Sequence, residues 1–487
     1  MDQILIGLTD NAQKKFLNLS MANRHCLIAG ATGTGKTVTL QTIVEQFSRA
    51  GISVFTADVK GDLSGLAMPG LNNPKITERL KSFGIDTTQG KENPTLFWDI
   101  YGQHGHPLRA TITEIGPLLL GRFVNANDIQ QGILNAAFSC ADDEGLLLLD
   151  LKDIRSMLDW MSENATSLKA KYGNIPKNSI GALQRGLLSL AEAGGDKFFG
   201  EPALKLEHLM QKDSSGKGII NILDARKLIN DPRLYSTFLL WLLSDLFEQL
   251  PEIGDVDKPK LVFFFDEAHL LFHSAPKFLL EKIEQMVRLI RSKGVGVYFI
   301  TQTPMDIPDS VLSQLGNRVQ HALRAFTPKD QKAVKTAAQT FRKNSKLNTE
   351  KIISELSVGE ALVSFLDKTG TPEIVEKVKI MPPLSRIGTI TDEERSKIIK
   401  QSSLFGIYEQ TIDRESAYEL IKKRTEARQP AMPQQSTPKP TVQRPATSRE
   451  KPSTTELLLK TTAKTLNSRI GQQIIRGLLG SIFGSKK

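Results

Sequence analysis

The chain has 487 residues, which suffices for two or three domains or for one large core with an insertion. Apolar residues make up 40 % and charged residues 24 %, which excludes a wholly disordered or fibrous protein. Apolar runs such as Leu261–Phe265 are far shorter than the roughly 20 residues of a membrane-spanning helix. The first ten residues lack the pattern of a signal peptide, so we expect a cytoplasmic protein. Its two cysteines, Cys26 and Cys140, cannot form a disulfide framework or a four-cysteine metal site.

The net charge of +10 is unevenly distributed. Residues 425–487 contain eleven Lys/Arg and three acids, so this tail accounts for +8 and the rest of the chain is nearly neutral. Bulk charge therefore does not indicate nucleic-acid binding, and a DNA site in the main body would have to be a local basic patch.

The first part of the chain alternates between strand and helix. Residues 26–29 form an apolar strand, a Gly/Thr loop follows, and then come a helix over about 37–49 and a strand over 52–57. This is a βαβ unit, which implies a parallel sheet. From about 108 to 212 strand-like runs vanish and apolar residues recur at helical spacing, which predicts an all-α insertion.

The alternation then resumes, with helices expected over 232–250 and 277–291 and strands over 218–223, 261–265, 295–300, 319–323 and 360–366. The strands are continuously apolar, which is typical of a parallel sheet covered on both faces. The sequence therefore predicts an α/β fold with a mostly parallel sheet and helices on both faces.

The end of the chain has a different composition. Residues 429–455 are rich in Pro, Gln, Ser and Thr and predict a disordered linker. In 456–487 apolar residues recur every three to four positions, which predicts an amphipathic basic tail helix. Such a helix needs a surface to bury its apolar stripe. We expect it to dock on a neighbouring subunit, with its own body and a membrane interface as alternatives.

The loop after the first strand matches the phosphate-binding pattern G-x-x-x-x-G-K-[ST] between a strand and a helix. Its glycines let backbone N–H groups point at phosphate oxygens, and the helix N-terminus adds positive potential. The lysine reaches the β- and γ-phosphates of ATP and the hydroxyl holds Mg²⁺. The candidate nucleotide-binding residues are Gly30, Ala31, Thr32, Gly33, Thr34, Gly35, Lys36, Thr37 and Val38, with Thr37 also a metal ligand.

Two acids, Asp266 and Glu267, follow the apolar strand Leu261–Phe265 directly. Acids there are costly unless they meet a cation. Beside a phosphate loop we expect Asp266 to orient the Mg²⁺ shell and Glu267 to polarise the attacking water; a solvated turn is the alternative. His269 could couple the site to a substrate or simply cap the next helix.

Polar residues also end the next buried strand. Thr301 and Gln302 are expected to face the γ-phosphate as a sensor of hydrolysis, with an ordinary strand-end turn as the alternative.

Together these segments resemble the HerA/FtsK branch of the RecA-like P-loop ATPases, and more closely the bacterial HerA-like (YjgR-type) family. The likeness covers essentially the whole chain and includes GATGTGKT at 30–37, ADVKGDLSGL at 57–66, FFFDEAHLLF at 263–272 and the long segment from 299 to 334. Archaeal HerA-type proteins carry an N-terminal β-barrel, for which we expect no room before residue 30. We therefore do not expect this chain to share the nuclease partner of those proteins.

The resemblance implies further roles. Asp58 occupies the position of an acid that follows the second core strand in this family. Arg291, with Arg288 as its neighbour, matches an arginine before the sensor strand, and Arg24 matches one before the phosphate-loop strand. An arginine near the γ-phosphate stabilises the charge that develops during transfer, whereas a surface salt bridge is the alternative for each.

The resemblance also implies a domain order. We expect a RecA-like core in two parts (1–107 and 216–390), a helical insertion (108–215), a helical C-terminal segment (391–428), the linker (429–455) and the tail helix (456–487). Because the chain has one phosphate loop and one acidic strand end, a trans arginine must come from another copy, which implies a homo-oligomeric ring, and the family implies a hexamer.

Three functions compete. The first is a Mg²⁺-dependent ATPase that translocates on or unwinds DNA, with channel loops sought around 122–131 and 177–185. The second is a nucleotide-gated assembly or partner-binding ATPase that does not move DNA, which the near-neutral body favours. The third, a small-molecule kinase, is disfavoured because Glu267 activates water rather than an acceptor hydroxyl.

Overall fold

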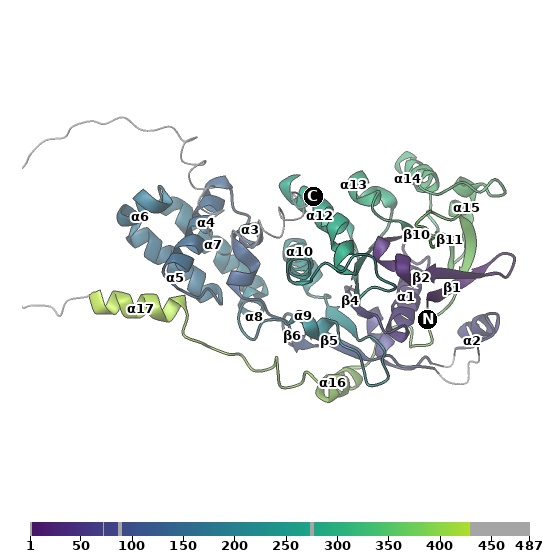
Figure 1. The fold of residues 1–487 in the computed structure, drawn as a ribbon, viewed down its shortest axis with the longest axis horizontal. Coiled ribbons are helices and arrows are strands. Elements are labelled where there is room, and N and C mark those ends of the chain that lie inside the picture. The colour runs from purple at the N-terminus through teal and green to yellow at the C-terminus, as the bar shows by residue number, and fades with distance from the viewer. Residues whose placement is uncertain (1, 72, 86–89, 273–276, 429–487) are drawn as a thin grey trace, which may run out of the picture. The chain divides into compact units, whose positions relative to one another are not determined.

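The computed structural model describes residues 2–71, 73–85, 90–272 and 277–428, which form two compact units (Figure 1). Within these described ranges, the core unit comprises the chain up to Leu108 together with Leu204–Gln410, and the helical unit comprises Arg109–Ala203 and 411–428. The predicted linker over 429–455 and the predicted tail helix over 456–487 lie outside the described residues.

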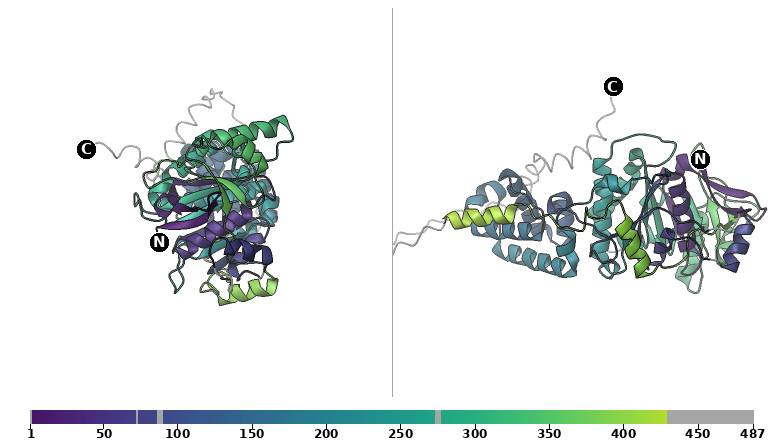
Figure 2. Two further views of the ribbon diagram at one scale, coloured as in Figure 1. Left: turned by 90° about the vertical axis from the view of Figure 1, so that its right-hand side faces the viewer. Right: turned by 90° about the horizontal axis from the view of Figure 1, so that it is seen from below.

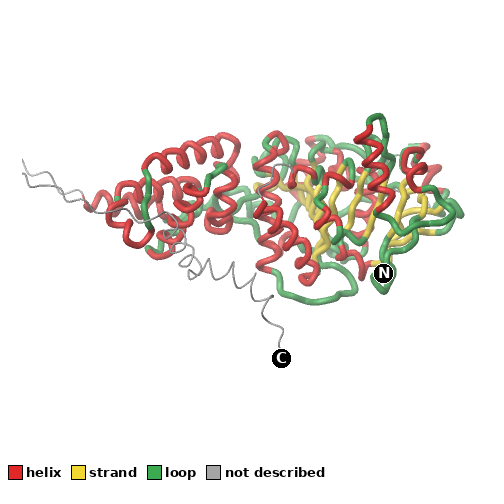
Figure 3. The backbone as a smooth tube through the Cα atoms, turned by 90° about the horizontal axis from the view of Figure 1, so that it is seen from above, coloured by secondary structure: helices red, strands yellow, loops and turns green. Residues whose placement is uncertain are grey.

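The core unit is built on one sheet, in which twelve strands are described in the order β2-β1-β12-β11-β10-β3-β9-β8-β4-β7-β5-β6. Figure 3 draws these strands in yellow. The strands from β10 to β6 are parallel, and β11, β12, β1 and β2 extend the sheet in antiparallel fashion. The strands are β1 (Gln3–Thr9), β2 (Lys14–Asn18), β3 (Cys26–Ala29), β4 (Ser53–Asp58), β5 (Thr95–Asp99), β6 (His106–Pro107), β7 (Ile220–Asp224), β8 (Leu261–Phe265), β9 (Val295–Thr301), β10 (Asn317–Gln320), β11 (Glu360–Ser364) and β12 (Glu376–Ile380). This confirms the predicted mostly parallel sheet.

Five strands, β1, β2, β5, β6 and β12, were not predicted, and β10 begins two residues earlier than expected. Strand β12 contains no apolar run, because only Val378 and Ile380 of this antiparallel strand are buried and the exposed Lys379 lies between them. Strand β10 starts at Asn317, a polar residue that is fully buried because its side-chain amide donates to the carbonyls of Met21 and His25.

Helices cover both faces of the sheet (Figures 2 and 3). Val262 and Phe264 of β8 pack in one cluster with Phe47 of α1, whereas the Phe263 ring stacks on Phe55 on the opposite face, where α12 contacts α10 and β9. The α-helices of the core unit are α1 (Lys36–Arg49), α2 (Pro74–Lys81), α9 (Leu206–Leu209), α10 (Pro232–Gln249), α11 (His269–Phe272), α12 (Lys277–Ile290), α13 (Asp309–Leu312), α14 (Pro328–Gln339), α15 (Thr349–Glu355) and α16 (Asp392–Gln401). All the parallel strands therefore end at one edge, where loops meet helix N-termini.

The helical unit contains α3 (Ile112–Phe123), α4 (Asp128–Asp143), α5 (Leu151–Glu163), α6 (Ala165–Tyr172), α7 (Lys177–Leu190), α8 (Asp196–Phe198) and α17 (Ala417–Arg428). Helix α17 packs on α5, and a buried Asp153 joins them by accepting hydrogen bonds from the Ser416 hydroxyl (2.5 Å) and the Tyr418 N–H (2.9 Å). The later part of the chain thus returns to the helical unit.

Among the described residues, no helix combines the length and the apolar character needed to cross a bilayer. Cys26 and Cys140 are free and buried.

Candidate nucleotide site

The phosphate loop spans Gly30–Thr37, from the end of β3 into the first turn of α1, at the carboxyl edge of the parallel strands. Gly35 precedes α1 with φ = 112°, and an added Cβ would lie 3.1 Å from the Gly359 nitrogen, so glycine suits this position. Lys36 Nζ donates to the carbonyls of Gly30 (2.5 Å) and Ala31 (3.1 Å). Burial lowers the pKa of Lys36, and the nearby Glu267 carboxylate acts in the opposite direction.

The remaining predicted loop residues follow this arrangement. Thr34 is buried and its hydroxyl donates to the Ala31 carbonyl at 2.7 Å, whereas Thr32 and Gly33 are exposed. Thr37 and Val38 lie in the first turn of α1 and are half-buried. The loop is therefore held in place on the side of Thr34 and faces solvent at Thr32 and Gly33, where phosphate groups can approach it.

Asp266 and Glu267 follow β8 at the same edge of the sheet. Burial first, and then the neighbouring Glu267 carboxylate, raise the pKa of Asp266 to about 7. Glu267 has φ = 49°, and its N–H donates to Asp266 Oδ1 at 2.9 Å. Its own carboxylate lies between two side chains, with Lys60 Nζ 3.7 Å from Oε1 and His269 Nδ1 3.5 Å from Oε2.

The loop after β4 contributes two residues that the sequence analysis missed, Lys60 and Asp62. Lys60 pairs with Glu267, and the Asp62 side chain hydrogen-bonds the Thr37 side chain. Burial raises the pKa of Asp62, and the nearby Lys60 opposes this shift. The pattern Asp58-Val-Lys-Gly-Asp62, directly after a strand that ends beside β8, was the signal that could have identified them.

Asp58 ends β4 as predicted from the family, and it is almost fully buried. Its carboxylate accepts the N–H groups of Gly61 (2.7 Å) and Leu63 (3.1 Å). Burial and the Asp62 carboxylate raise its pKa to about 6, against the effect of these two hydrogen bonds. In this structure Asp58 therefore shapes the loop that carries Lys60 and Asp62.

Thr301 and Gln302 lie at the end of β9, between β3 and β8. The Thr301 hydroxyl is buried and donates to Asp306 Oδ2 at 2.6 Å, which also accepts the Thr303 N–H. Gln302 is exposed at the same edge. Of this pair, Gln302 has the more accessible side chain.

Arg24 and Arg291 lie at the opposite edge of the sheet, just before β3 and β9 respectively. Arg24 precedes Gly30 by six residues of largely extended chain, about 20 Å at 3.3 Å per residue. Their guanidinium groups converge on one exposed carboxylate, with Nη2 3.4 Å (Arg24) and 4.0 Å (Arg291) from Asp255 Oδ1. The structure does not bring either arginine together with the phosphate loop of its own chain.

The donor set fits a magnesium nucleotide. Thr37, Asp62 and Asp266 supply the oxygen ligands that Mg²⁺ prefers, and Asp266 is an acid at a strand end whose pKa burial has raised. Among the described residues, no group of three or more His, Cys, Asp or Glu could hold a metal unaided. This suits an ion that is bound jointly by the protein and by substrate phosphates.

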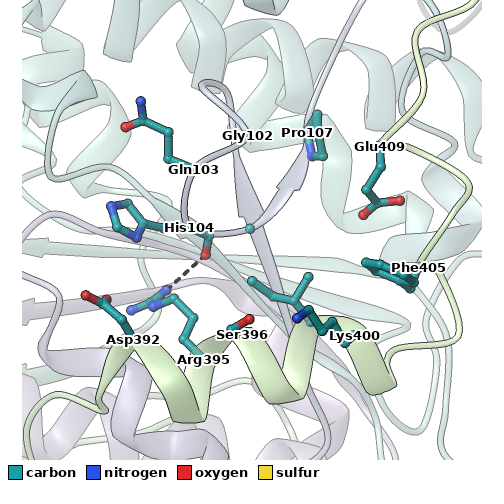
Figure 4. Close-up of a pocket in the computed structure, with 12 residues that line it drawn as sticks. Gly102, Gln103, His104, Pro107, Asp392, Arg395, Ser396, Lys400, Phe405 and Glu409 are labelled. Atoms are coloured by element: carbon teal, nitrogen blue, oxygen red, sulfur yellow. Dashed lines mark hydrogen bonds between the residues drawn. The ribbon is translucent and has the colours of Figure 1, made fainter.

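A cavity of about 550 Å³ lies elsewhere in the core unit, between α16 and the loop that leads into β6 (Figure 4). The buried Arg395 lies over the Phe97 ring at 4.5 Å and donates to the His104 carbonyl. Asp392 and Glu409 balance the cationic Arg395 and Lys400 in its lining. No residue predicted from the sequence lines this cavity, so the phosphate-loop edge remains the candidate site.

The strand order β10-β3-β9-β8-β4, with a phosphate loop after β3 and acids after β8, defines a RecA-like P-loop ATPase fold. The family described as "Helicase HerA-like C-terminal" matches residues 3–487. The chain therefore belongs to the HerA-like helicase family.

Relatives agree with this assignment. The DNA double-strand break repair helicases HerA of Sulfolobus acidocaldarius and Saccharolobus solfataricus are 23 % and 24 % identical, each over 74 % of this chain. The chain spans 65 % and 66 % of their lengths. The bacterial conjugative coupling protein TrwB (14 % identity, 80 % of this chain and 91 % of that one, TM-score 0.51) and VirB4 of Thermoanaerobacter pseudethanolicus (15 %, 77 % and 96 %, 0.50) share the fold.

Proposed function

We propose that the chain hydrolyses ATP with Mg²⁺ as cofactor. The observation that carries this proposal is that Lys36 of a phosphate loop and the pair Asp266–Glu267 lie at the same edge of one parallel sheet, with Glu267 close enough to Lys36 to perturb its pKa. The fold is shared with TrwB in complex with a non-hydrolysable ATP analogue (TM-score 0.50), which is consistent with a nucleotide at this edge.

Each residue then has a task. Backbone N–H groups of the loop and Lys36 bind the phosphates, while Thr37 and Asp266 hold Mg²⁺, which neutralises charge on the phosphates when bound. Glu267 accepts a proton from the attacking water as its oxygen bonds to the γ-phosphorus, and the bond to the leaving ADP oxygen breaks. Gln302 contacts the γ-phosphate side, and Asp58 positions the loop with Lys60 and Asp62.

We further propose that this ATPase acts as a motor on DNA in the cytoplasm. The names of its relatives, DNA double-strand break repair helicases, support this use of the fold. The alternative is an ATPase whose cycle drives assembly or partner binding without moving DNA, and the nearly neutral body of the chain favours it. ATP turnover measured with and without double- and single-stranded DNA, at two salt concentrations, separates the two. Stimulation that falls with salt indicates phosphate contacts.

We also propose a homo-oligomeric ring, with six subunits as in the family. Arg24 and Arg291 precede β3 and β9 and lie at the sheet edge opposite their own phosphate loop, so the proposal has either one meet the γ-phosphate of another copy. A head-to-tail contact that sets one sheet edge against the opposite edge of the next copy closes into a ring. The tail helix is proposed to dock on the neighbouring subunit.

The first experiment is the ATPase rate of the Lys36→Ala variant beside the wild type. Lys36→Ala removes the phosphate-binding cation and should abolish nucleotide binding, whereas the exposed Lys397→Ala on α16 serves as a matched control that leaves the rate unchanged. Wild-type turnover in Lys36→Ala would refute the proposal.

A further inference from the structure

No residue has so far been assigned to the nucleobase of the bound nucleotide. The acids after β8 lie on one side of the phosphate-loop strand β3, beyond β9, while β10 and β11 lie on the other side. If the γ-phosphate faces Glu267, the opposite end of the nucleotide, which carries the base, is expected toward the β10–β11 side. The residues at that end of the carboxyl edge are the ones that can touch it.

The segment of residues 358–360, where β11 begins, is hydrogen-bonded to the phosphate loop and its surroundings. The Gly359 N–H donates to the Thr34 carbonyl at 3.0 Å. The Glu360 carbonyl accepts a hydrogen bond from His321 Nδ1 at 3.0 Å, and His321 Nε2 bonds the Thr39 hydroxyl of α1 at 2.8 Å. His321 is fully buried, and burial lowers its pKa to about 4, so the ring is neutral at physiological pH. The segment is therefore held rigidly beside the loop.

Arg79 of α2 fixes the same segment from outside. Its Nε donates to the Ile380 carbonyl at 3.0 Å and its Nη2 donates to the Gly359 carbonyl. Gly359 has φ = 79°, and a Cβ there would lie 2.7 Å from Arg79 Nη1, so only glycine allows this approach. Two carbonyl partners fix the plane of the guanidinium group, which makes it a preorganised flat surface.

Val358, next to Gly359, has an apolar side chain that is 68 % exposed. Val358 is thus an exposed aliphatic side chain on a rigid segment that also contacts the planar guanidinium group of Arg79 and the phosphate loop. These features suit a ligand with a flat aromatic ring. Flat aromatic rings stack on guanidinium planes and pack against aliphatic groups.

We propose that Val358 and Arg79 form the nucleobase subsite and that its ligand is a purine. A purine offers a larger face to both side chains than a pyrimidine. This inference rests on the proposed function, because it requires a nucleotide on the phosphate loop.

The test compares ligands with and without a base. Competition against a fluorescent ATP analogue gives the dissociation constants of ATP, CTP and inorganic tripolyphosphate. Val358→Ser should weaken ATP about tenfold, as expected for lost apolar contacts, and leave tripolyphosphate within about twofold. Arg79→Lys keeps the positive charge but removes the planar guanidinium group, and it should also raise the dissociation constant of ATP. Wild-type protein should bind ATP more tightly than CTP.

Two controls match these variants. Leu71→Ser alters an equally exposed aliphatic side chain (67 %), and Arg342→Lys alters an exposed arginine that also bonds a carbonyl. Neither should change the ratio between ATP and tripolyphosphate. An unchanged ratio in Val358→Ser, or equal binding of CTP and ATP by the wild type, would overturn the subsite. If the wild type binds none of the three ligands, the proposed function itself fails.

Discussion

The carboxylate of Asp266 offers the most quantitative test of the candidate site. Its pKa in the folded protein is about 7, raised by burial and by Glu267, whereas an Asp in an unfolded chain has a pKa of about 3.9. Folding is therefore opposed by ionisation of this group. We predict that Asp266→Asn stabilises the nucleotide-free protein, because the amide has a similar shape and no charge.

The size of the effect follows from linkage. A difference of about three pKa units corresponds to about 4 kcal/mol at pH 8, where Asp266 is ionised in both states. At pH 5 the folded form is protonated while the unfolded chain is still mostly ionised, so the gain falls to about 2 kcal/mol. For a unit of this size the change at pH 8 corresponds to a rise in melting temperature of about 4 to 8 °C.

The assay is thermal unfolding at pH 8 and pH 5, with and without Mg²⁺ and ATP. Asp224→Asn is the matched control, because Asp224 also ends a strand of this edge but is paired with Arg226. Burial raises the pKa of Asp224, but the pairing with Arg226 outweighs it and lowers the pKa. Asp224→Asn should therefore destabilise the protein at pH 8, and the loss of stability should be smaller at pH 5. Added Mg²⁺ and ATP should stabilise the wild type but not Asp266→Asn. A variant no more stable than the wild type at pH 8 would refute the reasoning.

Four further predictions concern turnover and assembly. Glu267→Gln should bind ATP normally but release phosphate at least about 100-fold more slowly, and near-normal turnover would contradict its role. Lys60→Met should lower kcat with little change in KM, because Glu267 loses a cation 3.7 Å away; a pure KM effect would contradict this. Mixing Arg291→Ala with Lys36→Ala should restore partial ATPase activity, and no recovery in demonstrated mixed rings would favour a cis role. Deleting 430–487 should reduce the oligomer mass in light scattering, and an unchanged ring would eliminate docking on a neighbour.

The sequence predicted those parts of the fold whose signals are local. The strands β3, β8 and β9 are apolar runs, so their bounds were predicted nearly correctly. The phosphate loop is a contiguous motif, so the sequence alone was enough to locate it. Strands β1, β2 and β12 were missed because their stability comes from pairing at the antiparallel end of the sheet rather than from apolar runs. Lys60 and Asp62 were missed for a similar reason, because their roles depend on neighbours across the sheet.

Three neighbouring strands, β8, β4 and β7, end in a row of acids. Asp58 pairs in register with Asp224, and the register of β4 on β8 ends with Thr56 opposite Phe264, two residues before Asp58 and Asp266. The pKa is lowered only at Asp224, where Arg226 supplies the compensating charge, and it is raised at Asp58 and Asp266. Burial is the first cause of both raised pKa values, and the nearby Lys60 only partly opposes it at Asp266. The buried charge is therefore poorly compensated toward the β8 end of the row, which lies two strands from the phosphate-loop strand β3. A magnesium nucleotide bound at the phosphate loop would bring a cation to that end, so this charge imbalance supports the proposed nucleotide site.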